Sequence, residues 1–205
     1  MEHLFVPPRE EVDREWNYPL LHIPLFLMED LEKALAQLSN LRCCDDEGII
    51  AEMIKYSSDM MKIEVLKNFN IALHSGRFAD DWHQTIFRML PKDGDITQLK
   101  NWRPIAILPI MYKLFARLLY NRISPTLFSW QSEDQHAFTP DKRIEDALLQ
   151  AEVVIEHSLE YNIPLWLLSM DLRKVFDTVS HVHLLCSLGY HGLDPTYITL
   201  LQRTG

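Results

Sequence analysis

Residues 164–171 have the sequence PLWLLSMD, a short and almost entirely apolar run between a proline and an aspartate. A run of this length and composition predicts a central strand that is buried on both faces. Such a strand delivers Asp171 at its carboxyl end, where the edge of a sheet opens to solvent. An oxygen ligand in that position suits a hard cation such as Mg²⁺. The structural alternative is that Asp171 caps the following helix or pairs with Arg173 or Lys174.

Helical periodicity accounts for most of the remaining chain. Leu31, Ala34, Leu35 and Leu38 recur at the spacing of one helix face and predict a helix that starts near residue 29. The same reasoning predicts helices over about residues 63–75, 110–122, 144–159, 179–188 and 195–201. The helix predicted over residues 144–159 has a continuous apolar stripe that we expect to be buried, made of Ile144, Ala147, Leu148, Ala151, Val154, Ile155 and Leu159.

Two segments rich in β-branched and aromatic residues interrupt the helices. They cover residues 85–90 and 102–108 and are joined by a polar loop that contains Asp93 and Gly94. This order predicts a hairpin-like projection. Together with the helices and the predicted central strand, the hairpin places the chain in the α+β class, rich in helix and with a few short strands.

The domain organisation is inferred from the distribution of proline. Four prolines, at positions 7, 8, 19 and 24, interrupt residues 1–27, which we therefore predict to be a linker or a poorly ordered arm. No shift in composition divides residues 28–205, so these are expected to form one unit. A chain of 205 residues with 47% hydrophobic and 24% charged residues can bury an ordered core.

Charge and cysteine content restrict the function classes. The net charge of −9 argues against a surface that binds nucleic acid throughout, although a basic cleft can lie on an acidic body. Three cysteines, two of them adjacent, do not form a disulfide framework and favour an intracellular location, nuclear or cytoplasmic. No apolar run approaches the roughly 18 residues of a membrane span, so no membrane association is expected.

One pattern of candidate metal ligands lies near the C-terminal end. His181, His183 and Cys186 form a His-x-His-x-x-Cys sequence whose side chains are all of types that bind zinc. A structural zinc site needs four ligands in a tetrahedral arrangement, and a fourth is not evident near these three. Ordinary helix residues are therefore the favoured interpretation.

Four parts of the chain resemble motifs of reverse transcriptases from non-LTR retrotransposons and group II introns. Residues 168–181, LSMDLRKVFDTVSH, resemble the motif A region, and residues 101–109, NWRPIAILP, followed by 112–115, YKLF, resemble the fingers motif. Residues 89–95, MLPKDGD, resemble the segment before the fingers motif, and residues 135–147 resemble a degenerate form of the Gly-Phe-Arg-x-Gly block. All four occur in the order that the family has.

The resemblance implies a right-hand polymerase, of which this chain carries helix-rich fingers and part of the palm, with an incomplete antiparallel sheet. Asp171 matches the first catalytic aspartate, which with the carbonyl of Leu172 binds the two Mg²⁺ ions used for nucleotidyl transfer. Lys92 and Arg103 match residues that grip the triphosphate of the incoming dNTP; solvated surface charge is the alternative. Phe176 matches the bulky residue that excludes a ribose 2′-hydroxyl; core packing is the alternative.

The chain also departs from the family pattern. No aromatic-x-Asp-Asp motif, which would carry the second metal-binding carboxylates, follows Asp171. Ala137, Thr139 and Asp141 stand in the block where the family has glycine and arginine, and residues 42–48, RCCDDEG, are acidic where relatives are basic. We therefore expect Mg²⁺ to be bound weakly or not at all and the chain alone to be inactive.

Three functional interpretations follow from these matches and departures. In the first, RNA template, DNA primer and dNTPs bind when a further segment completes the site. In the second, the chain is a non-enzymatic interaction scaffold or the relic of a degenerate mobile element. In the third, the chain aggregates through an unpaired strand edge and exposed apolar surface.

Overall fold

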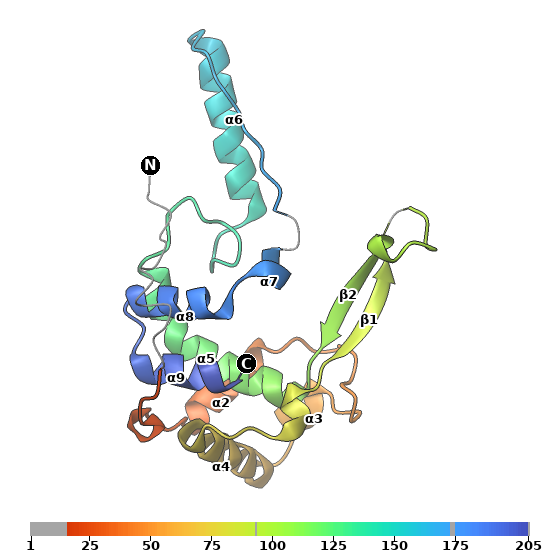
Figure 1. The fold of residues 1–205 in the computed structure, drawn as a ribbon, viewed down its shortest axis with the longest axis vertical. Coiled ribbons are helices and arrows are strands. Elements are labelled where there is room, and N and C mark those ends of the chain that lie inside the picture. The colour runs from red at the N-terminus through yellow and green to blue at the C-terminus, as the bar shows by residue number, and fades with distance from the viewer. Residues whose placement is uncertain (1–15, 93, 173–174, 205) are drawn as a thin grey trace.

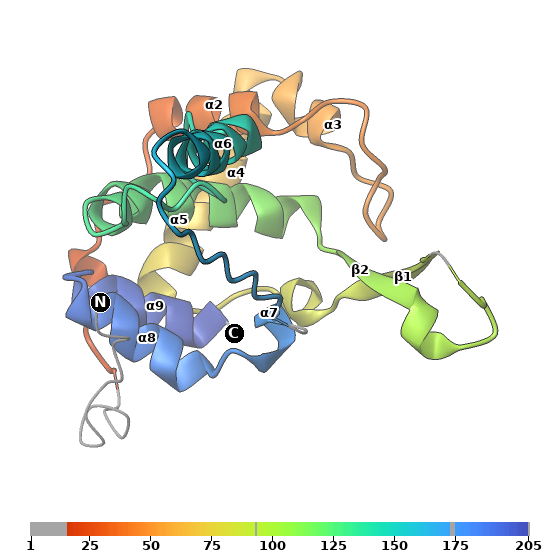
Figure 2. The same ribbon diagram turned by 90° about the horizontal axis from the view of Figure 1, so that it is seen from above.

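Helix α5 (Ile110–Phe128) lies at the centre of the fold (Figure 1). The structure is a computed structural model that describes residues 16–92, 94–172 and 175–204. One side of α5 is apolar at helical spacing, and its buried apolar residues are Ile110, Leu114, Phe115, Leu118 and Leu119. Figure 2 shows helix α2 (Met28–Gln37) above α5 and helix α9 (Pro195–Thr204) below it. Burial of apolar surface on α5 therefore organises the core.

Helices α2 and α4 (Asp59–Ser75) supply most of the surface that covers α5. The predicted apolar stripe of α2 is buried at Leu31, Ala34 and Leu35, which confirms that helix. Helix α4 ends at Gly76, which has a left-handed φ of 61°. A Cβ atom there would lie 2.7 Å from the side chain of Leu20, so glycine meets both the backbone and the packing requirement.

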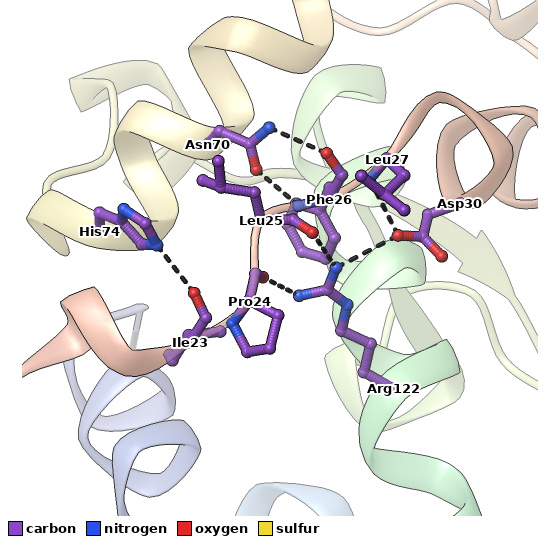
Figure 3. A network of polar contacts seen from close by, with 9 residues as sticks. All are labelled: Ile23, Pro24, Leu25, Phe26, Leu27, Asp30, Asn70, His74 and Arg122. Atoms are coloured by element: carbon purple, nitrogen blue, oxygen red, sulfur yellow. Dashed lines mark hydrogen bonds and ion pairs between the residues drawn. The ribbon is translucent and has the colours of Figure 1, made fainter.

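The predicted poorly ordered arm at residues 1–27 is wrong for its C-terminal part, while residues 1–15 lie outside the described residues. Leu20, Ile23 and Phe26 are buried in the core. We call residues 23–27 the N-terminal strap, because they cross α4 and α5 in an extended conformation (Figure 3). Pro24 disfavours a helix in this segment, but the side chains of Ile23 and Phe26 still pack into the core.

The N-terminal strap is held by side chains that satisfy its backbone. The Asn70 side-chain oxygen accepts from the N–H of Phe26 at 2.7 Å, and its amide donates to the Phe26 carbonyl at 3.0 Å. His74 Nε2 donates to the carbonyl of Ile23 at 2.8 Å. These three hydrogen bonds replace the backbone partners that a sheet would otherwise supply.

Arg122 of α5 holds the other side of the N-terminal strap (Figure 3). Its guanidinium donates to the carbonyls of Pro24 and Leu25 and forms an ion pair with Asp30 at 3.2 Å. The same group lies 4.2 Å from the centre of the Phe26 ring, a cation–π geometry. One side chain thus joins α5, the strap and the first turn of α2.

Asp45 makes a second long-range connection to α5. Its carboxylate is buried and accepts from the N–H of Ile49 at 2.8 Å and from the N–H of Ile110 at 2.9 Å. The first N–H groups of a helix have no partner inside the helix, so the carboxylate satisfies one of them and faces the positive end of the helix dipole. Asp45 therefore sets the position at which α5 begins.

The predicted hairpin is confirmed. Strands β1 (Ile86–Pro91) and β2 (Trp102–Ile107) form a two-stranded antiparallel sheet, in which Ile86 pairs with Ile107 and Pro91 with Trp102. Both figures of the whole fold show the hairpin extending away from the helices. Two residues separate the end of β2 from the start of α5, so a short connection joins the hairpin to the central helix.

Helix α6 (Ile144–Glu160) forms where the periodicity predicts it, but its expected burial is wrong. None of its residues is buried, and Ile144, Leu148 and Leu159 are exposed. Figure 1 shows α6 extending away from the core formed by α2, α4 and α5. An amphipathic pattern specifies an apolar stripe, whereas burial needs a second surface, and no described element covers this stripe.

The predicted central strand at residues 164–170 is also wrong. This segment has no regular secondary structure and returns alongside α6 in Figures 1 and 2. Trp166 is 92% exposed, and Leu167, Leu168 and Met170 are exposed as well. A strand needs hydrogen-bonding neighbours, and the sheet of the described chain consists of β1 and β2 alone.

The remaining elements are short. They are α3 (Ala51–Lys55), α7 (Val175–Thr178), α8 (His181–Tyr190) and the 3₁₀ turns η1 (Leu20–His22), η2 (Asp80–His83) and η3 (Leu99–Asn101).

The predicted helix end at Pro125 is too early, because α5 continues to Phe128 with this proline in its last turn, where only one helical hydrogen bond is lost. None of the helices in the described part of the chain combines the length and apolar character needed to cross a bilayer.

Replacing Arg122 tests the role of the N-terminal strap. Arg122→Met keeps much of the side-chain volume but leaves two backbone carbonyls without their donor, so we expect the free energy of unfolding to fall by about 2 kcal/mol. Urea denaturation followed by circular dichroism measures this change. Arg117→Met removes the same charge from α5 at a position with a cation–π contact to Tyr120, and should cost less than about 1 kcal/mol. Equal losses in the two variants would contradict the proposed role of Arg122.

A second substitution tests the connection between the acidic loop and α5. Asp45→Ala removes the acceptor of the Ile49 and Ile110 N–H groups and is expected to lower the free energy of unfolding by about 1–2 kcal/mol. Asp46→Ala, at the exposed neighbouring position, should change it by less than about 0.5 kcal/mol. Thermal melts of both variants decide the question, and an unchanged melting temperature for Asp45→Ala would exclude this capping role.

Candidate functional site

Lys92 and Arg103 lie on the same face of the hairpin. Arg103 pairs directly with Leu90 across the sheet, and the N–H of Lys92 donates to the Asn101 carbonyl at 2.6 Å, which continues the antiparallel pairing beyond Pro91. Lys92 and Arg103 are therefore diagonal neighbours, a relation in which long side chains reach each other. Both are exposed, and neither forms an ion pair with any residue that the structure describes.

Residues 95–101 of the loop between the two strands are joined by hydrogen bonds among themselves. The Asp95 carboxylate accepts from the hydroxyl of Thr97 at 2.7 Å, from its N–H at 2.9 Å and from the Gln98 amide at 3.1 Å. These bonds, the one from the Thr97 hydroxyl first, hold the pKa of Asp95 below its ordinary value. Asn101 Nδ2 donates to the Asp95 carbonyl at 2.7 Å. The Asp95 carboxylate is thus already occupied by donors from within the loop.

Asp171 and Leu172 lie at the end of the exposed segment that follows α6. Both residues are exposed, and neither belongs to a strand or helix. Among the described residues, no group of three His, Cys, Asp or Glu side chains is placed to hold a metal ion. The donor set around Asp171 therefore does not fit two magnesium ions within the described chain. Arg173 and Lys174, the alternative ion-pair partners, lie outside the described residues.

Phe176 is not packed in the core. It belongs to the short helix α7 and is 79% exposed, which argues against the core-packing alternative. Its ring meets that of Phe138, itself 82% exposed, in a T-shaped pair with centroids 6.1 Å apart. This edge-to-face geometry is a favourable aromatic arrangement. The structure thus brings the motif A region into contact with the degenerate block at residues 135–147.

The degenerate block keeps a left-handed backbone despite its missing glycines. Phe138 has a φ of 60° and Asp141 a φ of 62°. Asp tolerates this region better than most residues because its short side chain bonds to the local backbone, whereas a bulky Phe is strained there. Asp141, which stands where the family has glycine, thus adopts a left-handed backbone conformation that glycine also adopts, and it adds a negative charge.

The acidic loop at residues 42–48 has a role that the sequence did not indicate. Asp45 caps α5, as described above, and so is not a free repulsive charge. Asp46 is exposed and lines a hollow of about 480 Å³ at the base of the hairpin, together with Arg88. The connection between Asp45 and Ile110 spans 65 positions, a separation over which no local sequence signal operates.

The histidine and cysteine pattern of α8 does not form a metal site in the described chain. Cys186 is buried, while His181 and His183 are exposed, so the three side chains do not share one environment. Cys43 and Cys44, in the acidic loop, are exposed.

Comparison with known proteins adds a family to this geometry. A family model described as reverse transcriptase (RNA-dependent DNA polymerase) matches residues 90–203, more than half of the chain. This range contains the cation pair Lys92 and Arg103 as well as Asp171, Leu172 and Phe176. It also contains the contact between Phe138 and Phe176.

Three proteins of mobile elements are similar to the chain. A 149 kDa protein of transposon TX1 from Xenopus laevis is 25% identical over 182 residues, which cover 89% of this chain and 14% of that protein. The Pol polyprotein of the type-1 retrotransposable element R2 from Popillia japonica is 31% identical over 140 residues, 65% of this chain and 19% of that protein. The Pol polyprotein of the type-2 retrotransposable element R2DM from Drosophila melanogaster is 24% identical over 131 residues, 64% and 12% respectively.

The chain thus spans less than a fifth of the length of each of these relatives. The matched family model covers most of the segments on which the sequence resemblance was based, and the similar proteins come from non-LTR elements. The chain belongs to the reverse transcriptase family, and within it to the non-LTR retrotransposon type.

Proposed function

We propose that this chain supplies the nucleotide-binding fingers and the first catalytic carboxylate of an RNA-directed DNA polymerase. The observation that carries the proposal is the placement of Lys92 and Arg103 side by side on one face of an ordered, projecting hairpin. Its substrates are dNTPs, and its macromolecular partners are an RNA template and a DNA primer. The names of the similar Pol polyproteins and the matching family support this assignment.

The chemistry of the cation pair suits a triphosphate. The Arg103 guanidinium presents a planar set of donors that can bind two phosphate oxygens at once, and the Lys92 ammonium adds a mobile point charge. Neither cation is neutralised by a described carboxylate, so the charge of both is available to a ligand. The nearby Asp95 carboxylate is engaged by Thr97 and Gln98, which leaves it poorly placed to compete.

Phe176 is proposed to discriminate between deoxyribose and ribose. A rigid apolar ring excludes a 2′-hydroxyl by its volume and by offering no hydrogen-bond partner. The contact with Phe138 supports this role, because it limits the orientations that the exposed Phe176 ring can adopt.

Asp171 and the Leu172 carbonyl are proposed metal ligands of the complete enzyme. The family generally uses divalent metal ions, but one exposed carboxylate cannot hold and space two of them. Among the described residues, no group of three His, Cys, Asp or Glu side chains is placed to hold a metal ion. We therefore propose that this chain binds nucleotide but does not polymerise alone.

A second candidate function is a non-enzymatic interaction scaffold. It is favoured by α6 and the segment after it, which expose a large amount of apolar surface, including Leu148, Leu159 and Trp166. Apolar surface of this extent marks either a protein interface or an aggregation-prone region. Nucleotide binding by the hairpin separates this candidate from the first, since a scaffold has no need of Lys92 and Arg103.

Nucleotide binding is tested by titrating the chain with dTTP and Mg²⁺ in a calorimeter. Arg103→Gln should weaken binding about tenfold or more, because it removes charge-assisted hydrogen bonds to phosphate, and Arg103→Lys should recover part of the loss. Lys33→Gln, the same charge change on an exposed position of α2, serves as the control and should bind as the wild type does. Equal affinities for all four proteins would contradict the nucleotide site.

Polymerisation is tested by primer extension on an RNA template with Mg²⁺ or Mn²⁺. We expect no product from the chain alone, because the described residues contain no group of three His, Cys, Asp or Glu side chains placed to hold a metal ion. A product that is lost in Asp171→Asn would show that the chain assembles a working metal site by itself. That result would overturn the proposed inactivity while leaving the nucleotide site intact.

A further inference from the structure

A cavity of about 600 Å³ lies against a side of α5 that its buried residues do not occupy. Its volume is in the range of cavities that bind small molecules. The floor consists of residues from two turns of the helix, namely Tyr112, Lys113, Ala116, Arg117 and Tyr120. The remaining lining is apolar and includes the exposed ring of Phe138. None of the hairpin cations proposed to bind nucleotide lines this cavity.

Two cations of the cavity have no compensating acid. Lys113 and Arg117 lie about one helical turn apart, and both are half-buried. Neither forms an ion pair with a residue that the structure describes, and no Asp or Glu is found among the described residues around the cavity. A cation that is partly removed from water without a counter-ion costs free energy. An anion bound between these two side chains offsets that cost.

Aromatic rings are the other main feature of the cavity. The guanidinium of Arg117 lies 5.3 Å from the centre of the Tyr120 ring, so a planar cation is placed beside a planar ring. The Tyr112 ring contacts that of Trp82 in a T-shaped pair with centroids 5.9 Å apart, which limits its orientation from outside the cavity. Phe138 supplies a third ring. This combination favours a ligand that is both flat and negatively charged.

We propose that this cavity binds a planar aromatic carboxylate of one or two rings. The carboxylate accepts hydrogen bonds from Lys113 and Arg117, and the ring packs against Tyr112, Tyr120 and Phe138. No side-chain amide or carboxylate among the described lining residues is available to pair with the edge of a nucleobase, so charge and shape decide recognition. The site is independent of the nucleotide site proposed for the hairpin, because the two share no residue.

Calorimetric titration of the full chain with 2-naphthoate tests the proposal. We expect one ligand to bind per chain, with a dissociation constant below about 1 mM. Two matched probes separate the contributions of charge and ring. The neutral 2-naphthamide should bind about tenfold more weakly, because it lacks the charge-assisted hydrogen bonds. Decalin-2-carboxylate keeps the charge but has no flat ring, and should bind about threefold more weakly or worse.

Variants of α5 locate the bound ligand. Arg117→Gln should weaken 2-naphthoate binding about tenfold, because it removes a charged donor. Ala116→Leu leaves the charge unchanged but fills the floor of the cavity, and should weaken binding by at least as much. Lys33→Gln, the matched charge change on an exposed position of α2, should bind as the wild type does. Circular dichroism of each variant checks that its helix content is retained.

Several outcomes would overturn the proposal. They are a dissociation constant above about 1 mM for the wild type, equal affinities of the wild type, Arg117→Gln and Ala116→Leu, and equal affinities for 2-naphthoate and 2-naphthamide. Displacement of 2-naphthoate by dTTP, or its loss in Arg103→Gln, would place the ligand on the hairpin and exclude a separate site. Failure of the nucleotide site is distinguishable, since it appears as dTTP binding that does not depend on Arg103.

Discussion

Burial of one side of α5 is the constraint on which the rest of the structure depends. Leu114, Phe115 and Leu118 place this helix in the centre of the core, with α2 and α4 packed over it. Because two residues separate β2 from α5, the position of the helix also fixes the position of the base of the hairpin. The cations of the hairpin are therefore presented by a rigid support, which is how a projecting loop or hairpin acquires a defined binding geometry.

Polar side chains complete this support where regular structure cannot. The N-terminal strap enters the core without a sheet partner, so its buried backbone groups need donors and acceptors from side chains. Asn70, His74 and Arg122 provide them (Figure 3). Asp45 does the same for the first turn of α5. Each of these bonds joins parts of the chain that are far apart in sequence.

The candidate site divides between two environments with different degrees of support. Lys92 and Arg103, the proposed nucleotide-binding cations, lie on a paired hairpin, whereas Asp171 lies on an extended segment beside the exposed helix α6. The contact between Phe138 and Phe176 is the one described aromatic link between the motif A region and the degenerate block. A hairpin can orient phosphate ligands alone, but a metal centre requires several carboxylates held together. This difference explains why nucleotide binding and polymerisation are expected to be separable in this chain.

The sequence by itself determined most of the helices, the hairpin and the identity of the family, but not the strand expected at residues 164–170. The apolar spacing in α2 and α6, the turn residues between β1 and β2, and the motifs around Arg103 and Asp171 are encoded within short windows. Tertiary structure alone decided burial. The strap around Phe26 is packed although its prolines suggested disorder, while α6 and residues 164–170 are exposed although their composition suggested a core. An apolar pattern states which surface can be buried, but a packed partner surface and satisfied backbone groups decide whether it is.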